Sequence, residues 1–283
     1  MRHIQRRACN GPVELAAHGL FRREPSDALP VLLLSAAEEP SSRWPNDLLV
    51  GLAERSGGVI WFDTRDCGAS SWLDNPYTLD DLASDAVAVL DAFEVDRVHV
   101  VGRSMGGEVA QCLTLAGSER VASLVLLSTT PGRQADLAPP ADWLVDKMTE
   151  RLFADPPDDD DERAHWLIEQ QEWFAGPVFG FDRAEALAAA HREVAAGWRG
   201  ANLHGHAVVE APSRLDALAH IVVPTVVIHG TADPVYPVDH AHVLVERIAS
   251  SKLVLIEGLG HELPAGFVPD LLRLIDLAIS SSS

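Results

Sequence analysis

The sequence predicts a protein of the α/β class, with a mostly parallel, doubly wound sheet and a helical cap. Short apolar runs alternate with amphipathic segments in the first part of the chain, which is typical of a parallel sheet covered by helices. Residues 132–214 then show helical periodicity without a convincing strand, and the alternation resumes beyond them. We therefore expect a core of residues 1–131 and 215–283, with a cap of residues 132–214 inserted after the strand that ends near Thr129.

The individual elements follow from runs of apolar residues and from the signals that start and stop helices. Thr78 is a suitable N-cap for the second helix, and Asp80 and Asp81 lie in its first turn, where the helix dipole favours negative charge. We expect strands at 30–36, 58–66, 97–101, 121–129, 224–230 and 251–258, and helices at 44–57, 78–93, 105–116, 239–248 and 269–279.

Composition limits the kinds of partner that the protein can have. The 283 residues include 22 Lys and Arg against 42 Asp and Glu, which gives a formal net charge of −20. Such a surface repels nucleic acids and anionic membranes, so we expect a small-molecule substrate. No apolar run approaches the length of a membrane span, and the basic start of the chain leads into no apolar signal segment. Cys9, Cys67 and Cys112 are widely spaced, which indicates neither a disulfide framework nor a metal site. We expect a soluble, cytoplasmic protein, and nothing in the sequence indicates its oligomeric state.

The stretch "VHVVGRSMGGEVAQ" (residues 98–111) carries a candidate nucleophile. Gly102 and Gly106 lie two residues on either side of Ser104, as a very sharp strand-to-helix turn requires, because a Cβ at either position would collide across the bend. Such a turn points the serine hydroxyl away from the sheet. The alternative is a glycine-rich turn in which Ser104 only caps the following helix.

Two further residues have the positions that a base and an orienting acid need. A serine hydroxyl is a poor nucleophile and requires a general base that is itself held by a carboxylate. Asp233 follows the predicted strand at 224–230, and His261 follows the last predicted strand in a loop with Gly258 and Gly260. Since the chain order Ser, Asp, His is that of the strand–Ser–helix motif, we expect Ser104, Asp233 and His261 to form a catalytic triad. The alternative for Asp233 is an aspartate that caps its own turn.

The motifs "WPNDLL", "FDTRDCGAS", "GRSMGGEVAQ", "PSRLDAL" and "HGTADPVYP" resemble those of α/β-hydrolases, and more narrowly those of aclacinomycin-type methylesterases of aromatic polyketide biosynthesis. The resemblance implies an α/β-hydrolase fold and an oxyanion hole made by two backbone N–H groups. One belongs to Met105, the residue after the serine. The other aligns with Ala37, in "SAAEEPSS", where the family usually has His-Gly or Gly-Gly. Glu38 and Glu39 thereby bring negative charge near a developing anion.

These observations predict a cofactor-independent serine esterase that cleaves a carboxylic ester through an acyl-enzyme, with a methyl ester of a bulky, polyketide-like molecule as the candidate substrate. The same triad can perform C–C bond hydrolysis, lactone opening or lyase chemistry, and a ligand-binding protein on a hydrolase scaffold is a further alternative. The aromatic residues of the cap predict an apolar substrate pocket, although a small helical cap also needs large side chains for its own core. The acidic run at 155–162 lacks calcium-loop spacing, so we expect a solvated loop and no metal. The candidate substrate-binding residues are Trp143, Trp166, Trp173 and Phe174.

Overall fold

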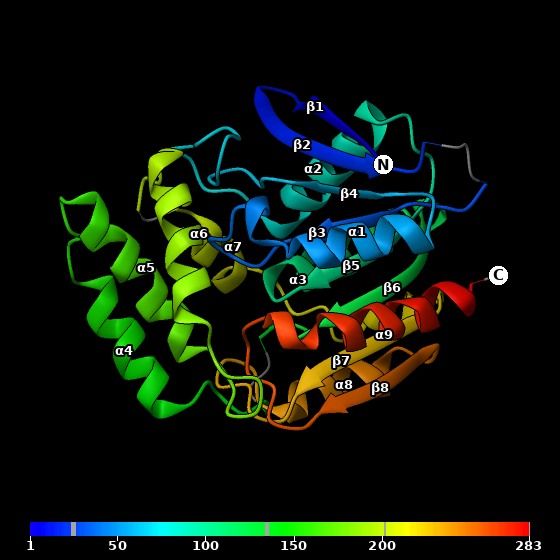
Figure 1. Cartoon of the computed structure of the whole chain (residues 1–283). Helices are drawn as coiled ribbons and strands as arrows, with labels where there is room; N and C mark the ends of the chain where they lie inside the picture. The colour runs from blue at the N-terminus through cyan, green and yellow to red at the C-terminus, as the bar shows by residue number, and fades with distance from the viewer. Residues whose placement is uncertain (24–26, 134–135, 201, 283) are drawn as a thin grey trace.

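A computed structural model of the protein describes residues 1–23, 27–133, 136–200 and 202–282 (Figure 1). Within these ranges eight strands form one sheet in the order β1-β2-β4-β3-β5-β6-β7-β8. All neighbours from β4 to β8 are parallel, while β2 runs antiparallel to both β1 and β4. The predicted fold class, a mostly parallel sheet with helices, is confirmed. The strands are β1 (Arg2–Asn10), β2 (Val13–Phe21), β3 (Val31–Leu34), β4 (Val59–Phe62), β5 (Val98–Arg103), β6 (Val121–Leu127), β7 (Thr225–Gly230) and β8 (Ser251–Ile256).

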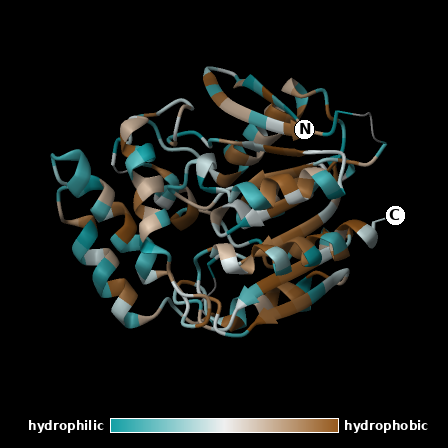
Figure 2. Ribbon diagram, viewed as in Figure 1, coloured by the Kyte–Doolittle hydropathy of each residue, from teal (hydrophilic) through white to brown (hydrophobic). Residues whose placement is uncertain are grey.

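Helices cover both faces of the sheet because its strands are apolar on both sides. Alternate residues of a strand point to opposite faces. Leu32 accordingly belongs to the core cluster that includes residues of α2, α3 and α8, whereas Leu33 belongs to the cluster that includes residues of α1 and α9. Figure 2 shows the apolar residues concentrated on the strands and on the helix faces turned towards them. These helices are α1 (Asn46–Arg55), α2 (Leu79–Ala92), α3 (Met105–Ala116), α8 (Val238–Arg247) and α9 (Val268–Ser280), with short 3-10 turns η1 (Ser41–Arg43), η2 (Ser118–Arg120), η3 (Ala217–His220) and η4 (Ala265–Phe267).

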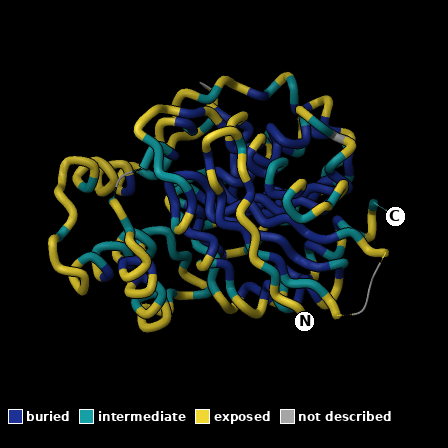
Figure 3. The backbone as a smooth tube through the Cα atoms, turned by 90° about the horizontal axis from the view of Figure 1, so that it is seen from above, coloured by how far each residue is buried: buried dark blue, intermediate teal, exposed yellow. Residues whose placement is uncertain are grey.

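Four helices lie between β6 and β7, and the described part of this segment contains no strand. They project beyond the carboxyl ends of the parallel strands (Figure 1) and are far more exposed than the sheet (Figure 3). Their small core lies between the second and third of them and includes Ile168 and Val194. No helix in the described ranges combines the length and apolarity needed to cross a bilayer. The helices are α4 (Asp142–Leu152), α5 (Asp160–Trp173), α6 (Arg183–Ala195) and α7 (His204–Val209).

The amino-terminal hairpin of β1 and β2 was not predicted from the sequence, where the first expected strand begins at residue 30. β1 is mostly exposed, so its apolar pattern is weak, but β2 alternates in burial and pairs with β4. The hairpin turns at Gly11 and Pro12. The positive φ of Gly11 (58°), followed by proline with its fixed negative φ, fits a two-residue type II′ turn. The Gly11–Pro12 pair was the signal in the sequence that could have identified this turn.

Candidate active site

The turn between β5 and α3 holds Ser104 in a backbone conformation that non-glycine residues seldom adopt. Its φ is 53° and its ψ is −122°, a conformation that costs on the order of 1–3 kcal/mol and occurs mainly at functional sites. A Cβ at Gly102 would lie 2.3 Å from the carbonyl oxygen of Gly106, across the bend as expected. A Cβ at Gly106 would instead lie 2.1 Å from the carbonyl oxygen of Leu34, at the end of β3. Gly106 therefore allows α3 to start directly against β3.

The structure brings Ser104, His261 and Asp233 together in one hydrogen-bonded chain. Ser104 Oγ lies 2.9 Å from His261 Nε2, and His261 Nδ1 lies 2.8 Å from Asp233 Oδ2. All three residues are at most 8% exposed. The Ser104 side chain makes no hydrogen bond that caps α3, so the alternative of a capping serine does not describe this turn. The arrangement has the geometry of a nucleophile, a base and an orienting acid.

Asp233 uses its two carboxylate oxygens for different purposes. Oδ1 accepts hydrogen bonds from the backbone N–H groups of Val235 and Tyr236, at 2.8 and 3.0 Å, and so caps its own turn. Oδ2 is left for His261. Burial on its own raises the pKa of Asp233, but the charge and hydrogen bond of His261, with a contribution from His229, hold this pKa below its ordinary value. The carboxyl group is therefore an anion at neutral pH, as an orienting acid requires.

The loop that carries His261 is fixed by Phe174, the residue that follows α5. The carbonyl oxygen of Phe174 accepts hydrogen bonds from the N–H groups of His261 and Glu262, at 2.8 and 3.1 Å. The Phe174 ring meets the His261 ring edge-on at 5.7 Å, and Tyr236 does the same at 5.6 Å. Phe174 thus lies at the site, although its observed contact is with the candidate base.

Two backbone N–H groups in the region of Ser104 have no acceptor in the part of the chain that the structure describes. Neither the amide of Met105 nor that of Ala37 has a hydrogen-bond acceptor among the described residues. Met105 begins α3, and Ala37 lies in the loop of residues 35–40 that joins β3 to η1, which we call the β3–η1 loop. The contact of Gly106 with the end of β3 places this loop next to the serine turn. Free amides at such a position are what an oxyanion hole requires.

The two glutamates of the β3–η1 loop have different environments. Both guanidinium Nη groups of Arg103, which is 4% exposed, bind the carboxylate of Glu39 at 2.8–3.1 Å. This ion pair offsets the charge of Glu39. Glu38 lines two cavities. Desolvation by the surrounding protein raises the pKa of its carboxyl above the ordinary value, although a hydrogen bond to Gln170 and the charge of Arg151 reduce this shift.

Two cavities, of about 470 and 240 Å³, share Glu38, Trp198 and Gly200 in their walls. The larger one lies between η1, the loop after β4 and the end of α6, and the smaller one lies against α4 and α5. Trp166 and Trp173 line the smaller one, where the Arg151 guanidinium stacks over Trp166 at 3.9 Å. Neither cavity is lined by Ser104 or His261, and Ser104 is 8% exposed. A larger cavity of about 780 Å³ lies between α2, α3 and α7. None of the three triad residues lines it, so it is separate from the candidate active site.

The structure does not bring the four candidate substrate-binding residues to one place. Trp143 lies on α4 with 47% of its surface exposed and lines neither cavity, so the structure does not bring it to the site. Trp198 and Trp44 do line these cavities and were not among the candidates. Trp44 lies far from the cap in sequence, so nothing local indicated that it would line a cavity beside the cap.

The fold and these motifs define a member of the α/β-hydrolase fold family, to which the chain belongs. The family model described as "alpha/beta hydrolase fold" matches residues 30–164. The chain is similar to rhodomycin D methylesterase DauP of Streptomyces sp. strain C5, with 34% identity over 266 residues, 85% of this chain and 87% of that one. It is also similar to a non-heme chloroperoxidase of Streptomyces lividans, with 29% identity over 89% of this chain and 93% of that one. The solved structure of esterase RhEst1 from Rhodococcus sp. ECU1013 aligns over 100% of both chains with a TM-score of 0.79 and 22% identity.

Proposed function

We propose that the protein is a serine esterase that needs no cofactor. The observation that carries this proposal is the Ser104–His261–Asp233 chain, with hydrogen bonds of 2.9 and 2.8 Å beside two free backbone amides. In the proposed reaction Ser104 Oγ attacks the ester carbonyl carbon while His261 Nε2 takes the hydroxyl proton. The carbonyl oxygen becomes an oxyanion that accepts hydrogen bonds from the N–H groups of Met105 and Ala37.

Collapse of the tetrahedral intermediate breaks the bond to the leaving alkoxide, which receives the proton from His261 and departs as the alcohol. A water molecule then gives a proton to His261 and attacks the acyl-enzyme, releasing the carboxylic acid and restoring Ser104. Asp233 stabilises the imidazolium in both halves of the reaction, because its carboxyl group is ionised in its buried position.

For the substrate we propose a methyl ester of a bulky, polyketide-like molecule, held under a cap of residues 132–214. The similarity to a rhodomycin D methylesterase supports this class. The cavities support it as well, since Trp166, Trp173 and Trp198 line them while the buried core of the cap consists of Ala164, Ile168, Ala190 and Val194. Aromatic rings on a cavity wall suit a flat or apolar ligand, although the Arg151 guanidinium stacks over both Trp166 and Trp173.

The proposal is tested with methyl esters of aromatic acids of increasing size, with methanol release as the readout and Ser104→Ala as the control. We expect the parent protein to release methanol from at least one aromatic ester and the variant to release none above background. Release of methanol at equal rates by both proteins would overturn the assignment. Turnover of lactones or 1,3-diketones without any ester hydrolysis would favour another reaction of the same triad. Ligand binding without turnover of any of these compounds would favour a binding protein.

A further inference from the structure

His204 is a fully buried histidine that the proposed reaction does not use. It begins α7, the short helix that leads from the segment between β6 and β7 back to the sheet, and its surface is 0% exposed. Nothing in the sequence distinguished it from the other histidines that precede Asp233. Its contacts in the structure lie on the β3–η1 loop and on the loop after β4.

The two ring nitrogens of His204 have different partners, which fixes the tautomer. Nδ1 faces two N–H donors, the backbone amide of Glu38 at 2.8 Å and the side-chain amide of Asn202 at 3.2 Å. Nε2 faces the carbonyl oxygen of Arg65 at 2.8 Å and the hydroxyl of Thr64 at 3.3 Å. A carbonyl can only accept, so the proton is on Nε2 and Nδ1 carries the lone pair.

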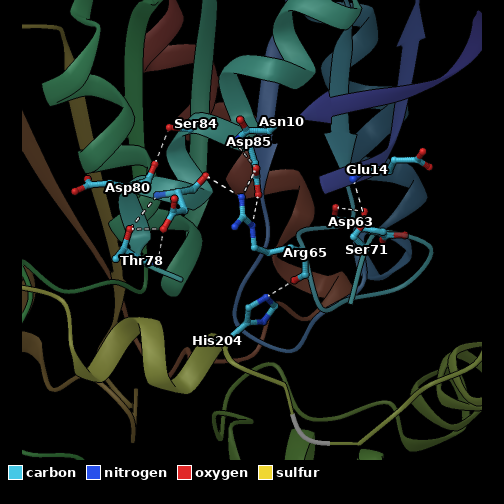
Figure 4. Close-up of polar contacts among 12 residues, drawn as sticks. Asn10, Glu14, Asp63, Arg65, Ser71, Thr78, Asp80, Ser84, Asp85 and His204 are labelled. Atoms are coloured by element: carbon cyan, nitrogen blue, oxygen red, sulfur yellow. Dashed lines mark hydrogen bonds and ion pairs between the residues drawn. The ribbon is translucent and has the colours of Figure 1, made fainter. Parts of the chain in front are cut away.

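The carbonyl that accepts the hydrogen bond from Nε2–H belongs to a rigidly held residue, Arg65. The guanidinium of Arg65 binds both carboxylate oxygens of Asp85, at 2.6 and 2.7 Å, and Asp85 is 0% exposed. Asn10 of the amino-terminal hairpin donates to the same carboxylate at 2.9 Å. Figure 4 shows this series of contacts, from Asn10 through Asp85 and Arg65 to the His204 ring. His204 is therefore anchored to the sheet and to α2.

The other end of the series is the peptide unit next to the proposed oxyanion donor. Glu38 has a φ of 63°, which is unfavourable for a side chain of its size, so the loop needs a contact that holds it in this conformation. The N–H of Glu38 belongs to the peptide unit that also contains the Ala37 carbonyl, so fixing it fixes the turn at Ala37. Glu39 and Ser41 are held separately, by Arg103 and by Asp63. Among the described contacts, only the one to His204 acts on the amide of Glu38.

We propose that His204 is a positioning residue for catalysis, which holds the β3–η1 loop through the Glu38 amide and thereby aims the Ala37 N–H at the oxyanion. This proposal rests on the esterase function proposed above. It also makes the orientation of this donor depend on α7, and hence on the placement of the segment between β6 and β7.

Two substitutions at one position separate the two bonds of the ring. The side-chain oxygen of His204→Asn can take the place of Nδ1 and accept from the Glu38 amide, but it cannot reach the Arg65 carbonyl. The amide nitrogen of His204→Gln can take the place of Nε2 and donate to the Arg65 carbonyl, but it leaves the Glu38 amide without an acceptor. Each variant loses the contacts of one ring nitrogen, so both are destabilised in a similar way.

We expect the kcat of His204→Gln on an ester to fall roughly 10- to 100-fold with little change in KM, less than the roughly 10²–10³ of losing an oxyanion donor outright. We expect His204→Asn to stay within about threefold of the parent, on the view that the loop keeps its tether. Equal losses in the two variants, or a loss confined to KM, would overturn the positioning role.

Hydrogen exchange of the Glu38 amide, followed by NMR, tests the tether without any enzyme activity. We expect slow exchange in the parent and in His204→Asn, and fast exchange in His204→Gln. Identical exchange in all three proteins would overturn the tether. If exchange follows the expected pattern and the parent hydrolyses no ester, the proposed function fails while the tether stands.

Discussion

Replacement of Gly106 by alanine would separate the geometry of the proposed oxyanion hole from the chemistry of Ser104. The new Cβ would lie 2.1 Å from the carbonyl oxygen of Leu34 and 2.6 Å from that of Ser35. Both atoms are backbone, so neither can turn aside as a flexible side chain does. Either α3 or the end of β3 must retreat by about 1.3 Å for the first contact to reach the 3.4 Å of ordinary contact. This shift separates the Met105 amide on α3 from the Ala37 amide beyond β3.

We expect kcat to fall on the order of 10²-fold, because a displacement of about 1 Å in a catalytic group has this effect. The overpacking should also lower the free energy of unfolding by about 1–3 kcal/mol. The matched control is Gly117→Ala at the other end of α3. There the nearest atom to a new Cβ is Glu119 Oε1 at 3.5 Å, and φ is −155°, so neither activity nor stability should change appreciably.

The assay compares initial rates on the best ester with urea unfolding curves for the parent and both variants. A folded Gly106→Ala protein that retains the parent kcat would refute the reasoning. It would mean that the distance between the two amides does not matter for turnover.

Two other predictions follow from the same region. Ala37→Pro removes the second proposed donor and should lower kcat about 10²–10³-fold with little change in KM. Ala37→Gly keeps the N–H group and should preserve or improve kcat. A folded Ala37→Pro protein with the parent rate would place the donor elsewhere. Burial lowers the pKa of His204 from 6.5 to about 4, although its hydrogen bond to Arg65 and the charge of Asp66 act in the opposite direction. Between pH 6.5 and pH 4 the unfolded chain therefore binds a proton that the folded protein does not bind. Stability due to this residue is therefore lost as the pH falls from about 6.5 to about 4. Urea unfolding at pH 7 and pH 4.5 should show a loss of about 2–3 kcal/mol relative to His204→Asn. Equal losses in the two proteins would contradict a neutral, buried ring.

The core of the fold and the order of Ser104, Asp233 and His261 could be predicted because each depends on local sequence. A parallel strand buried on both faces is a continuous apolar run, and the sharp turn at Ser104 requires glycines at fixed positions. The sheet then brings the ends of β5, β7 and β8 to one edge, so the three residues needed only their chain positions to be placed together.

The residues that the sequence did not reveal act through long-range contacts. The His204 ring meets Glu38, which is 166 positions away, and Arg65 at 139 positions. Arg103 has no local feature that indicates its buried pair with Glu39. The exposed strand β1 lacks the apolar alternation that identifies strands, since it is held by pairing with β2 rather than by burial.

If Ser104 is a nucleophile activated by His261, a fluorophosphonate should label it covalently. Such a probe loses fluoride when a serine oxygen attacks its phosphorus, which leaves a stable adduct whose mass can be assigned to one peptide. We expect one adduct per chain on the peptide that contains Ser104, none in Ser104→Ala, and much slower labelling in His261→Ala. An adduct on another residue, or no adduct in protein that is folded by circular dichroism, would contradict this expectation.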